Sequence, residues 1–204
     1  MLNAYRQGIF PWYSEGQPIL WWSPDPRAVL FPEHLKVSRS LRKTLRKGLF
    51  RVAADSAFRE VLEGCAAPRP DQDGTWLLPE MKQAYVRLHE LGYAHSVEAW
   101  HDGALVGGLY GLALGQVFYG ESMFTRRTDA SKVAFVHLVR QLQGWGFRLI
   151  DCQMSTSHLM SLGAEEIPRG QFVSLLDRYC DARGRPPGPW RLEPMEVLND
   201  PIAG

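Results

Sequence analysis

The stretch 106–153 constrains the fold more than any other part of the chain, because it predicts strand, turn, strand, helix and strand in that order. Two β-prone runs, 105–114 and 116–124, are separated by a single glycine, and this arrangement predicts a hairpin. The side chain of Asp129 can cap a helix whose apolar residues keep a helical spacing until two glycines end it. The run 147–153 then predicts a further strand.

Three polar residues in the strands of this stretch, Glu121, Asp151 and Gln153, have mainly apolar neighbours. Alternation along a strand places Asp151 and Gln153 on one face, and Ile150 and Cys152 on the other. Glu121 lies in an apolar strand, where an inward-facing acid needs a partner or a ligand. Two alternatives stay open on the pattern alone: Glu121 lies on a solvated face and Asp151 caps the next turn, or both belong to a functional site.

Helical patterns flank the central strands, and the chain therefore predicts an α+β fold with a mixed, mainly antiparallel sheet flanked by helices. The same layout occurs in acyl-transferring N-acetyltransferases. Those enzymes bind the pyrophosphate of coenzyme A on a glycine-containing turn at the start of the central helix. The corresponding junction here, 125–132, contains no glycine, which disfavours an acyltransferase that uses coenzyme A.

Charge and cysteine content narrow the class of protein. The net charge is +1, so attraction for polyanions depends on local clusters of cations. The chain has neither a long apolar run nor a signal-peptide layout, and we expect a cytoplasmic protein without membrane association.

The three cysteines are far apart and argue against a disulfide framework or a zinc site. Cys152, with His158 as its base, is a possible nucleophile. Strand alternation, however, places Cys152 with Ile150 on the apolar face of the strand, which favours an inert thiol.

All the charged residues of the segment 38–49 are basic, and we call the helix predicted there the cationic helix. It contains no acid, and its basic residues recur at helical spacing: Arg39, Arg42, Lys43, Arg46 and Lys47. We expect this helix to bind a polyanion rather than to be an ordinary solvated face. Nucleic-acid phosphates are favoured over an anionic membrane, because only three leucines back the helix.

The first thirty residues are crowded with aromatic rings and prolines, which exclude a long helix. We expect an extended, turn-rich piece whose rings mostly cover a core. One or two of the tryptophans can instead stack on a nucleobase beside the basic helix.

Several motifs in the same order resemble those of leucyl/phenylalanyl-tRNA-protein transferases. They include Gly-Ile-Phe-Pro-Trp, Gly-Glu-Ser-Met-Phe and Leu-Ile-Asp-Cys-Gln, and the matching segments are 8–12, 21–27, 74–76, 89–92, 120–124, 130–132, 149–153 and 161–164. The resemblance implies an enzyme that moves leucine or phenylalanine, with methionine as a further candidate, from aminoacyl-tRNA to the N-terminal arginine or lysine of a protein. The product carries an N-terminal degradation signal.

The resemblance also implies an organisation and a set of partners. Residues 1–28 correspond to a remnant of a small N-terminal domain, and residues 29–204 to an aminoacyltransferase domain similar to the N-acetyltransferase (GNAT) fold. Neither a cofactor nor a metal is expected. We expect a monomer whose partners are aminoacyl-tRNA and acceptor proteins.

Site residues follow from the resemblance by motif position. Trp12 and Trp76 are expected to sandwich the terminal adenine. Glu121 is expected to hold the α-amino group of the carried amino acid, while Asp151 and Gln153 act on the incoming amine. The cationic helix is expected to bind tRNA phosphates. The pocket for the carried side chain is expected to be lined by Met123, Phe135, Leu138, Leu142 and Ile150.

Two departures from the family pattern are visible. Family members usually begin with an additional N-terminal stretch, whereas this chain starts just upstream of Trp12, which indicates a late start or a shortened protein. The turn 154–157 replaces a more usual turn with asparagine and aspartate. A non-catalytic RNA-binding module, built on the cationic helix and the tryptophans, remains the second alternative.

Overall fold

A computed structural model describes residues 1–68 and 77–193, so Trp76 lies outside the described residues. One seven-stranded sheet forms the centre of the fold, with strand order β4-β5-β6-β7-β8-β3-β9. Neighbouring strands are antiparallel except for β7 and β8, which run parallel. The strands are β3 (Arg27–Leu30), β4 (Arg51–Ala54), β5 (Ala94–His101), β6 (Ala104–Leu114), β7 (Val117–Thr125), β8 (Leu149–Gln153) and β9 (Glu165–Ile167). The predicted α+β class is confirmed.

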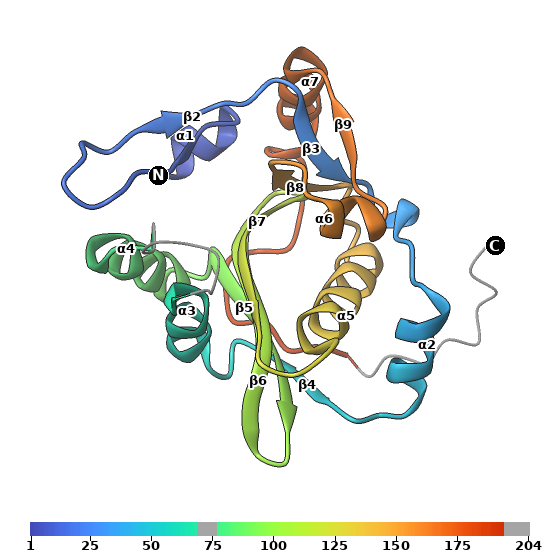
Figure 1. The fold of residues 1–204 in the computed structure, drawn as a ribbon. Coiled ribbons are helices and arrows are strands. Elements are labelled where there is room, and N and C mark those ends of the chain that lie inside the picture. Colours follow the sequence, from blue (N-terminus) through green and yellow to red (C-terminus); the bar gives the residue numbers. More distant parts are fainter. Residues whose placement is uncertain (69–76, 194–204) are drawn as a thin grey trace.

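Helices cover both faces of the sheet (Figure 1). α3 and α4 pack on one face, and α5 packs on the other. The remaining helices lie around the sheet, and α2 is next to α5. The helices are α1 (Leu2–Arg6), α2 (Arg39–Arg46), α3 (Phe58–Ala66), α4 (Pro79–Glu90), α5 (Ala130–Gly144), α6 (Ser157–Ser161), α7 (Arg169–Tyr179) and the 3-10 helix η1 (Pro32–His34). Because each face is covered, two separate apolar cores form.

The N-terminal segment forms a small unit beside the main sheet. Two short strands, β1 (Phe10–Pro11) and β2 (Trp21–Trp22), pair as a hairpin that projects at the upper left of Figure 1. Tyr5 of α1 is only 1% exposed and belongs to the core under α3 and α4. The extended, turn-rich interpretation is confirmed for residues 8–26, whereas residues 2–6 form the short helix α1. The expectation that most rings cover a core holds for only half of them: Tyr5, Phe10 and Tyr13 are buried, but Trp12, Trp21 and Trp22 are exposed.

The helix expected after Asp129 is present, and its apolar stripe is buried as the spacing predicts. The expected side-chain cap, however, was wrong. Asp129 occupies the N-cap position with φ of 67°, and its side chain makes no capping hydrogen bond. Its carboxylate instead accepts a hydrogen bond from Thr44 Oγ1 at 2.9 Å, which ties α2 to the start of α5.

A β-bulge interrupts the pairing of β6 and β7. Gly111 pairs with Gly120 and Tyr110 pairs with Ser122, so Glu121 is an extra residue without a partner across the strand. The bulge shifts the alternation of side chains along β7. Tyr119 and Phe124, five positions apart, consequently face the same core, which unbroken alternation forbids.

The parallel pairing of β7 and β8 is short. Residues 117–119 pair with 149–151, and the two strands separate immediately afterwards. The bulge at Glu121 and the end of β8 at Gln153 both lie just beyond this point. Carboxyl ends of parallel strands that separate in this way leave a gap in the sheet for a ligand. Among the described helices, none has the length and apolarity needed to cross a membrane.

Candidate active site

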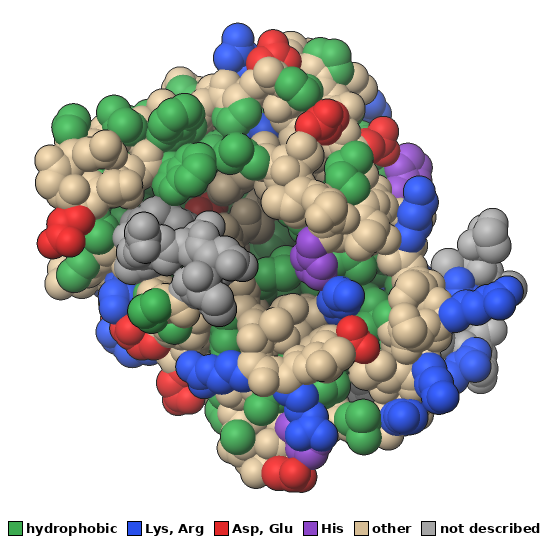
Figure 2. All heavy atoms as spheres, in the orientation of Figure 1, with side chains coloured by type: hydrophobic (Ala, Val, Ile, Leu, Met, Phe, Trp, Pro, Cys, Tyr) green, Lys and Arg blue, Asp and Glu red, His purple; other side chains and the backbone are tan. Residues whose placement is uncertain are grey.

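A cavity of about 460 Å³ lies where β7 and β8 separate. Figure 2 shows the molecule hollowed near its centre, with hydrophobic side chains visible inside the hollow. β7 contributes residues 120–123 to the wall, and the end of β8 contributes Cys152 and Gln153. The hairpin contributes Phe10, Pro11 and Trp12 from the other side.

The lining of the cavity falls into two groups according to the core beside which each residue lies, and we call them the apolar lobe and the aromatic lobe. The apolar lobe is lined by side chains that belong to the core beside α5 or pack against it: Leu109, Phe118, Met123, Phe135, Leu138 and Ile150. The aromatic lobe is lined on the side of α3 and the hairpin by Phe10, Trp12, Cys65, Ala67 and Tyr110. The cavity therefore has an apolar wall beside α5 and, beside α3 and the hairpin, a wall in which three of the five residues are aromatic.

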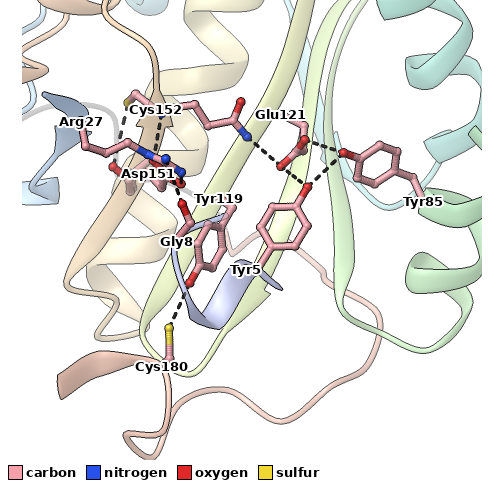
Figure 3. Close-up of polar contacts among 11 residues, drawn as sticks. Tyr5, Gly8, Arg27, Tyr85, Tyr119, Glu121, Asp151, Cys152 and Cys180 are labelled. Atoms are coloured by element: carbon pink, nitrogen blue, oxygen red, sulfur yellow. Dashed lines mark hydrogen bonds and ion pairs between the residues drawn. The ribbon is translucent and has the colours of Figure 1, made fainter. Parts of the chain in front are cut away.

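Glu121 lines the cavity and accepts hydrogen bonds from two buried phenols (Figure 3). Tyr85 Oη donates to Oε2 at 2.6 Å, and Tyr5 Oη donates to Oε1 at 2.8 Å. Burial raises the pKa of Glu121 to about 7, although the two phenol donors act in the opposite direction. The carboxyl group can thus gain or lose a proton near neutral pH.

Gln153 connects Glu121 to the end of β8. Its side-chain Nε2 donates to Glu121 Oε1 at 3.0 Å. Its backbone is in the left-handed region, with φ of 63°, and its backbone N–H donates to Asp151 Oδ1 at 2.9 Å. Because an amide nitrogen only donates, the amide oxygen of Gln153 is the atom that can accept a hydrogen bond from a ligand in the cavity.

Asp151 is fully buried and forms a two-point ion pair with Arg27, which is 1% exposed. Arg27 Nε donates to Oδ1 at 2.8 Å, and Nη2 donates to Oδ2 at 2.7 Å. The guanidinium also donates to the carbonyl oxygen of Gly8 and lies between the rings of Phe10 and Phe172. Asp151 does not line the cavity, but it is hydrogen-bonded to the backbone of Gln153, and its negative charge adds to the rise in the pKa of Glu121.

The structure brings most of the predicted site residues together. Glu121, Gln153 and Trp12 line the cavity, as do Met123, Phe135, Leu138 and Ile150. Leu142 is fully buried in the core beside α5 but does not line the cavity. The roles that the family resemblance assigns to these residues stay predictions, and Trp76 lies outside the described residues.

Cys152 lines the cavity, but burial raises the pKa of its thiol, so the group stays protonated and weakly nucleophilic at neutral pH. The interpretation as an inert thiol is therefore favoured. In the parts of the chain that the structure describes, no cluster of three or more histidine, cysteine, aspartate or glutamate side chains could hold a metal ion.

Sequence reasoning missed three residues of the site: Tyr5, Tyr85 and Arg27. Tyr85 belongs to the apolar stripe of α4, and Tyr5 is one of many N-terminal rings, so neither stood out. Arg27 could have been found. It is a cation at the head of the apolar run Arg-Ala-Val-Leu, and the argument that an inward-facing charge needs a partner applies to it as it does to Glu121.

The cationic helix forms as predicted. Ser38 Oγ accepts a hydrogen bond from Leu41 N at 3.2 Å and caps α2, while Leu41 is buried. Lys and Arg side chains gather at the lower right of Figure 2, where α2 lies in Figure 1. A shallow surface hollow is lined by Arg39, Arg42, Lys43, Arg46 and Lys47, none of which forms an ion pair with another described residue.

Comparison with known proteins identifies the relatives of this chain. Residues 29–177 match the family model described as Leucyl/phenylalanyl-tRNA protein transferase, and residues 1–25 match the model of the N-terminal domain of that family. The leucyl/phenylalanyl-tRNA–protein transferase of Aromatoleum aromaticum is 63% identical over 193 residues, which cover 95% of this chain and 81% of the relative. The enzyme of the same name from Syntrophobacter fumaroxidans is 66% identical over 177 residues, covering 86% of this chain and 76% of the relative.

Among solved structures, a GCN5-related N-acetyltransferase from Kribbella flavida matches with a TM-score of 0.42 at 14% identity, covering 81% of this chain and 59% of that protein. The family assignment rests on the sequence matches, which extend over both the hairpin segment and the main sheet. The chain belongs to the leucyl/phenylalanyl-tRNA protein transferase family.

Proposed function

We propose that this enzyme transfers leucine or phenylalanine from aminoacyl-tRNA to the N-terminal arginine or lysine of an acceptor protein. The observation that carries the proposal is the apolar lobe beside the Glu121–Gln153 pair. The lobe suits an apolar amino-acid side chain, and the polar pair suits the amino groups that take part in the reaction. The reaction needs no cofactor, because the aminoacyl ester is already activated.

The apolar lobe holds the side chain of the carried amino acid. Met123, Phe135, Leu138 and Ile150 line it, and three of these four are buried within the core, so the pocket is firmly supported. Leu142 lies behind this lining and supports it. An apolar pocket of this kind accepts leucine or phenylalanine and disfavours charged side chains, which would lose hydration there.

The aromatic lobe holds the terminal adenosine of the tRNA. Trp12 lines this lobe at the rim of the cavity and is 40% exposed, so its ring can stack on the base. Trp22 packs on Trp12 with ring centroids 5.8 Å apart and donates Nε1–H to the Trp12 carbonyl oxygen at 2.7 Å. The hairpin therefore holds Trp12 in position. Trp76 is expected on the opposite side of the adenine.

Glu121 and Gln153 act on the amino groups. The ionised carboxylate of Glu121 holds the α-ammonium group of the carried amino acid, in a charge-assisted hydrogen bond. The amide oxygen of Gln153 accepts a hydrogen bond from the attacking amine and orients its lone pair toward the ester carbonyl carbon. The new C–N bond forms, the C–O bond to the ribose breaks, and the proton of the amine ends on the ribose oxygen.

Asp151 acts through Gln153. Its carboxylate fixes the backbone of Gln153 and is held in turn by Arg27, so the amide stays aimed at the cavity. Asp151 is therefore a positioning residue, and its charge also polarises the backbone N–H of Gln153.

The cationic helix binds phosphates of the tRNA. The side chains of Arg39, Lys43, Arg46 and Lys47 are exposed, and Arg42 is partly exposed. Because none of these cations forms an ion pair with an acid in residues 1–68 or 77–193, they can neutralise a phosphate backbone. We further propose a cytoplasmic monomer without membrane association, in which residues 1–28 form the small N-terminal part and residues 29–204 the aminoacyltransferase domain.

Product analysis tests the proposed reaction. The protein is incubated with leucyl-tRNA and a peptide that begins with arginine, and the products are measured by mass spectrometry. We expect the peptide to gain one leucine residue on its N-terminal nitrogen. A folded protein that binds the tRNA but leaves the peptide unchanged would contradict the proposal.

A further inference from the structure

The hydroxyl group of Tyr110 is a buried polar group on a residue that lines the cavity. The side chain is 0% exposed, and its Oη has no hydrogen-bond partner among the described residues. Tyr110 nevertheless lines the aromatic lobe. A buried hydroxyl without a partner destabilises the free protein, and native structures rarely retain such groups without a reason.

The position of Tyr110 is fixed from several sides. Tyr110 belongs to β6 and pairs with Ser122 of β7, directly beside the bulge that carries Glu121. Its ring packs edge-on against Tyr85, with centroids 5.1 Å apart, and against Phe58, with centroids 6.1 Å apart. The ring therefore cannot easily turn its hydroxyl toward another protein acceptor.

The hydroxyl groups of three neighbouring buried tyrosines, in contrast, have hydrogen-bond partners within the protein. Tyr5 and Tyr85 donate to Glu121, and Tyr119 is within hydrogen-bond distance of Cys180 Sγ, at 3.0 Å. Burial raises the pKa of Tyr110 well above its ordinary value, so the phenol keeps its proton and can donate. Tyr110 is thus a donor held in place in the free enzyme.

The ligand parts proposed for the two lobes differ in whether they can accept a hydrogen bond from Tyr110. The side chain of leucine or phenylalanine has no hydrogen-bond acceptor, whereas a nucleoside has ring nitrogens and ribose oxygens. We infer that the Tyr110 hydroxyl donates a hydrogen bond to the terminal nucleoside of aminoacyl-tRNA when the nucleoside fills the aromatic lobe. The inference rests on the proposed function, and it adds a nucleoside-binding residue to the site.

A Tyr110→Phe variant removes only the hydroxyl. The probe is the amide analogue of phenylalanyl-adenosine, which binds but is not transferred, measured by calorimetry. We expect its Kd to rise roughly three- to tenfold, the usual effect of losing one neutral hydrogen bond. We also expect the Tm of the free variant to be above that of the wild type, because an unsatisfied hydroxyl has been removed.

Tyr119→Phe is the matched control, because Tyr119 is equally buried, has a partner and does not line the cavity. We expect this variant to bind the analogue with an unchanged Kd and to show no rise in Tm. A Tyr110→Phe variant that bound the analogue as tightly as the wild type would overturn the inference. So would a fall in its Tm, which would reveal a partner within the free protein.

The two proposals fail separately in this experiment. If leucine transfer occurs but Tyr110→Phe leaves the Kd unchanged, the inference fails and the proposed function stands. If the analogue binds and Tyr110→Phe weakens it, but the wild type transfers no leucine, the nucleoside contact stands and the proposed function fails.

Discussion

The carboxylate of Asp151 and the guanidinium of Arg27 form an ion pair inside the protein, with N–O distances of 2.8 and 2.7 Å. The pair joins the first strand after the N-terminal hairpin, β3, to the strand that carries Gln153, β8. Because the same carboxylate also accepts the backbone N–H of Gln153, the stability of the fold and the geometry of the site depend on one buried contact.

Asp151→Ala should destabilise the protein strongly. Removing one partner of a buried ion pair leaves an uncompensated charge, and we expect the free energy of unfolding to fall by about 3–5 kcal/mol. The measurement is urea unfolding followed by tryptophan fluorescence. A double variant, Arg27→Met with Asp151→Leu, should regain most of the loss, because well-packed apolar residues often replace a buried pair without cost.

The exposed ion pair of Arg6 and Asp181 supplies the control for this experiment. Its side chains are 41% and 80% exposed, so Asp181→Ala should change the free energy of unfolding by less than about 1 kcal/mol. Equal losses for Asp151→Ala and Asp181→Ala would contradict the importance assigned to the buried pair.

Stability should depend on pH through Glu121. Its pKa rises from 4.5 to about 7 on folding, so the folded protein binds this proton more tightly than the unfolded chain does. Ionising Glu121 therefore costs stability progressively as pH increases from about 5 to about 7, and the cost is constant above that range. Glu121→Gln should remove this component, so its free energy of unfolding relative to wild type should increase over the same interval. Parallel stability curves for the two proteins would contradict the shift.

The cationic helix should control tRNA binding without affecting the chemical step. Replacing Arg42, Lys43, Arg46 and Lys47 by glutamine should weaken tRNA binding. It should also make the negative slope of log K against log salt concentration shallower, by roughly 1 for each lost phosphate contact. The transfer rate at saturating tRNA should be unchanged. Filter binding at several salt concentrations and single-turnover kinetics measure the two quantities.

Arg59 and Arg87 are suitable control positions for the cationic helix, because both are exposed and lie on α3 and α4, away from α2. Neutralising these two residues should leave the salt dependence as it is in wild type. Because two cations are neutralised here and four in the helix variant, an effect half as large as that of the helix variant would mean that net charge alone governs binding.

The apolar lobe should set the preference between amino acids. Leu138→Phe adds volume to the wall of the lobe, and we expect kcat/KM for phenylalanyl-tRNA to fall roughly tenfold more than kcat/KM for leucyl-tRNA. Competition between the two labelled donors measures the ratio. Leu142→Met, which changes a buried residue behind the wall, should leave the ratio nearly unchanged, and an equal change in both variants would exclude Leu138 from the pocket.

The fold was predictable where local patterns dominate. The hairpin 105–124, the helix after Asp129 and the strand 147–153 follow from glycine position, helical spacing and β-propensity, all of which act over a few residues. The α2 helix followed from the helical spacing of its cations. These signals are local, and tertiary packing reinforced them.

The site was less predictable, because its contacts join distant parts of the chain. The bond from Tyr5 to Glu121 spans 116 residues, and the bond from Arg27 to Asp151 spans 124. Strand alternation placed Asp151 and Gln153 together but could not show that one is sealed in the core while the other turns into the cavity. That difference arises from the left-handed backbone at Gln153 and from Arg27, and neither is encoded in the pattern of β8.

The bulge at Glu121 was also invisible in the sequence. An acid in an apolar strand indicated that a partner was needed, but the extra residue in the pairing of β7 is what lets Glu121 meet two phenols while Met123 joins the apolar lobe. Register depends on both strands together, and a single strand sequence does not specify it.

The most direct test of the account is the rate of leucine transfer from leucyl-tRNA to a peptide that begins with arginine, compared between wild type and Gln153→Asn. Asparagine tolerates the left-handed backbone at this position but draws the amide back by one methylene. We predict that wild type transfers leucine to this peptide and not to one that begins with alanine, and that Gln153→Asn lowers kcat about 100-fold with tRNA binding unchanged. Full activity in Gln153→Asn, or equal transfer to both peptides, would contradict the assignment of this cavity as the place where the peptide bond forms.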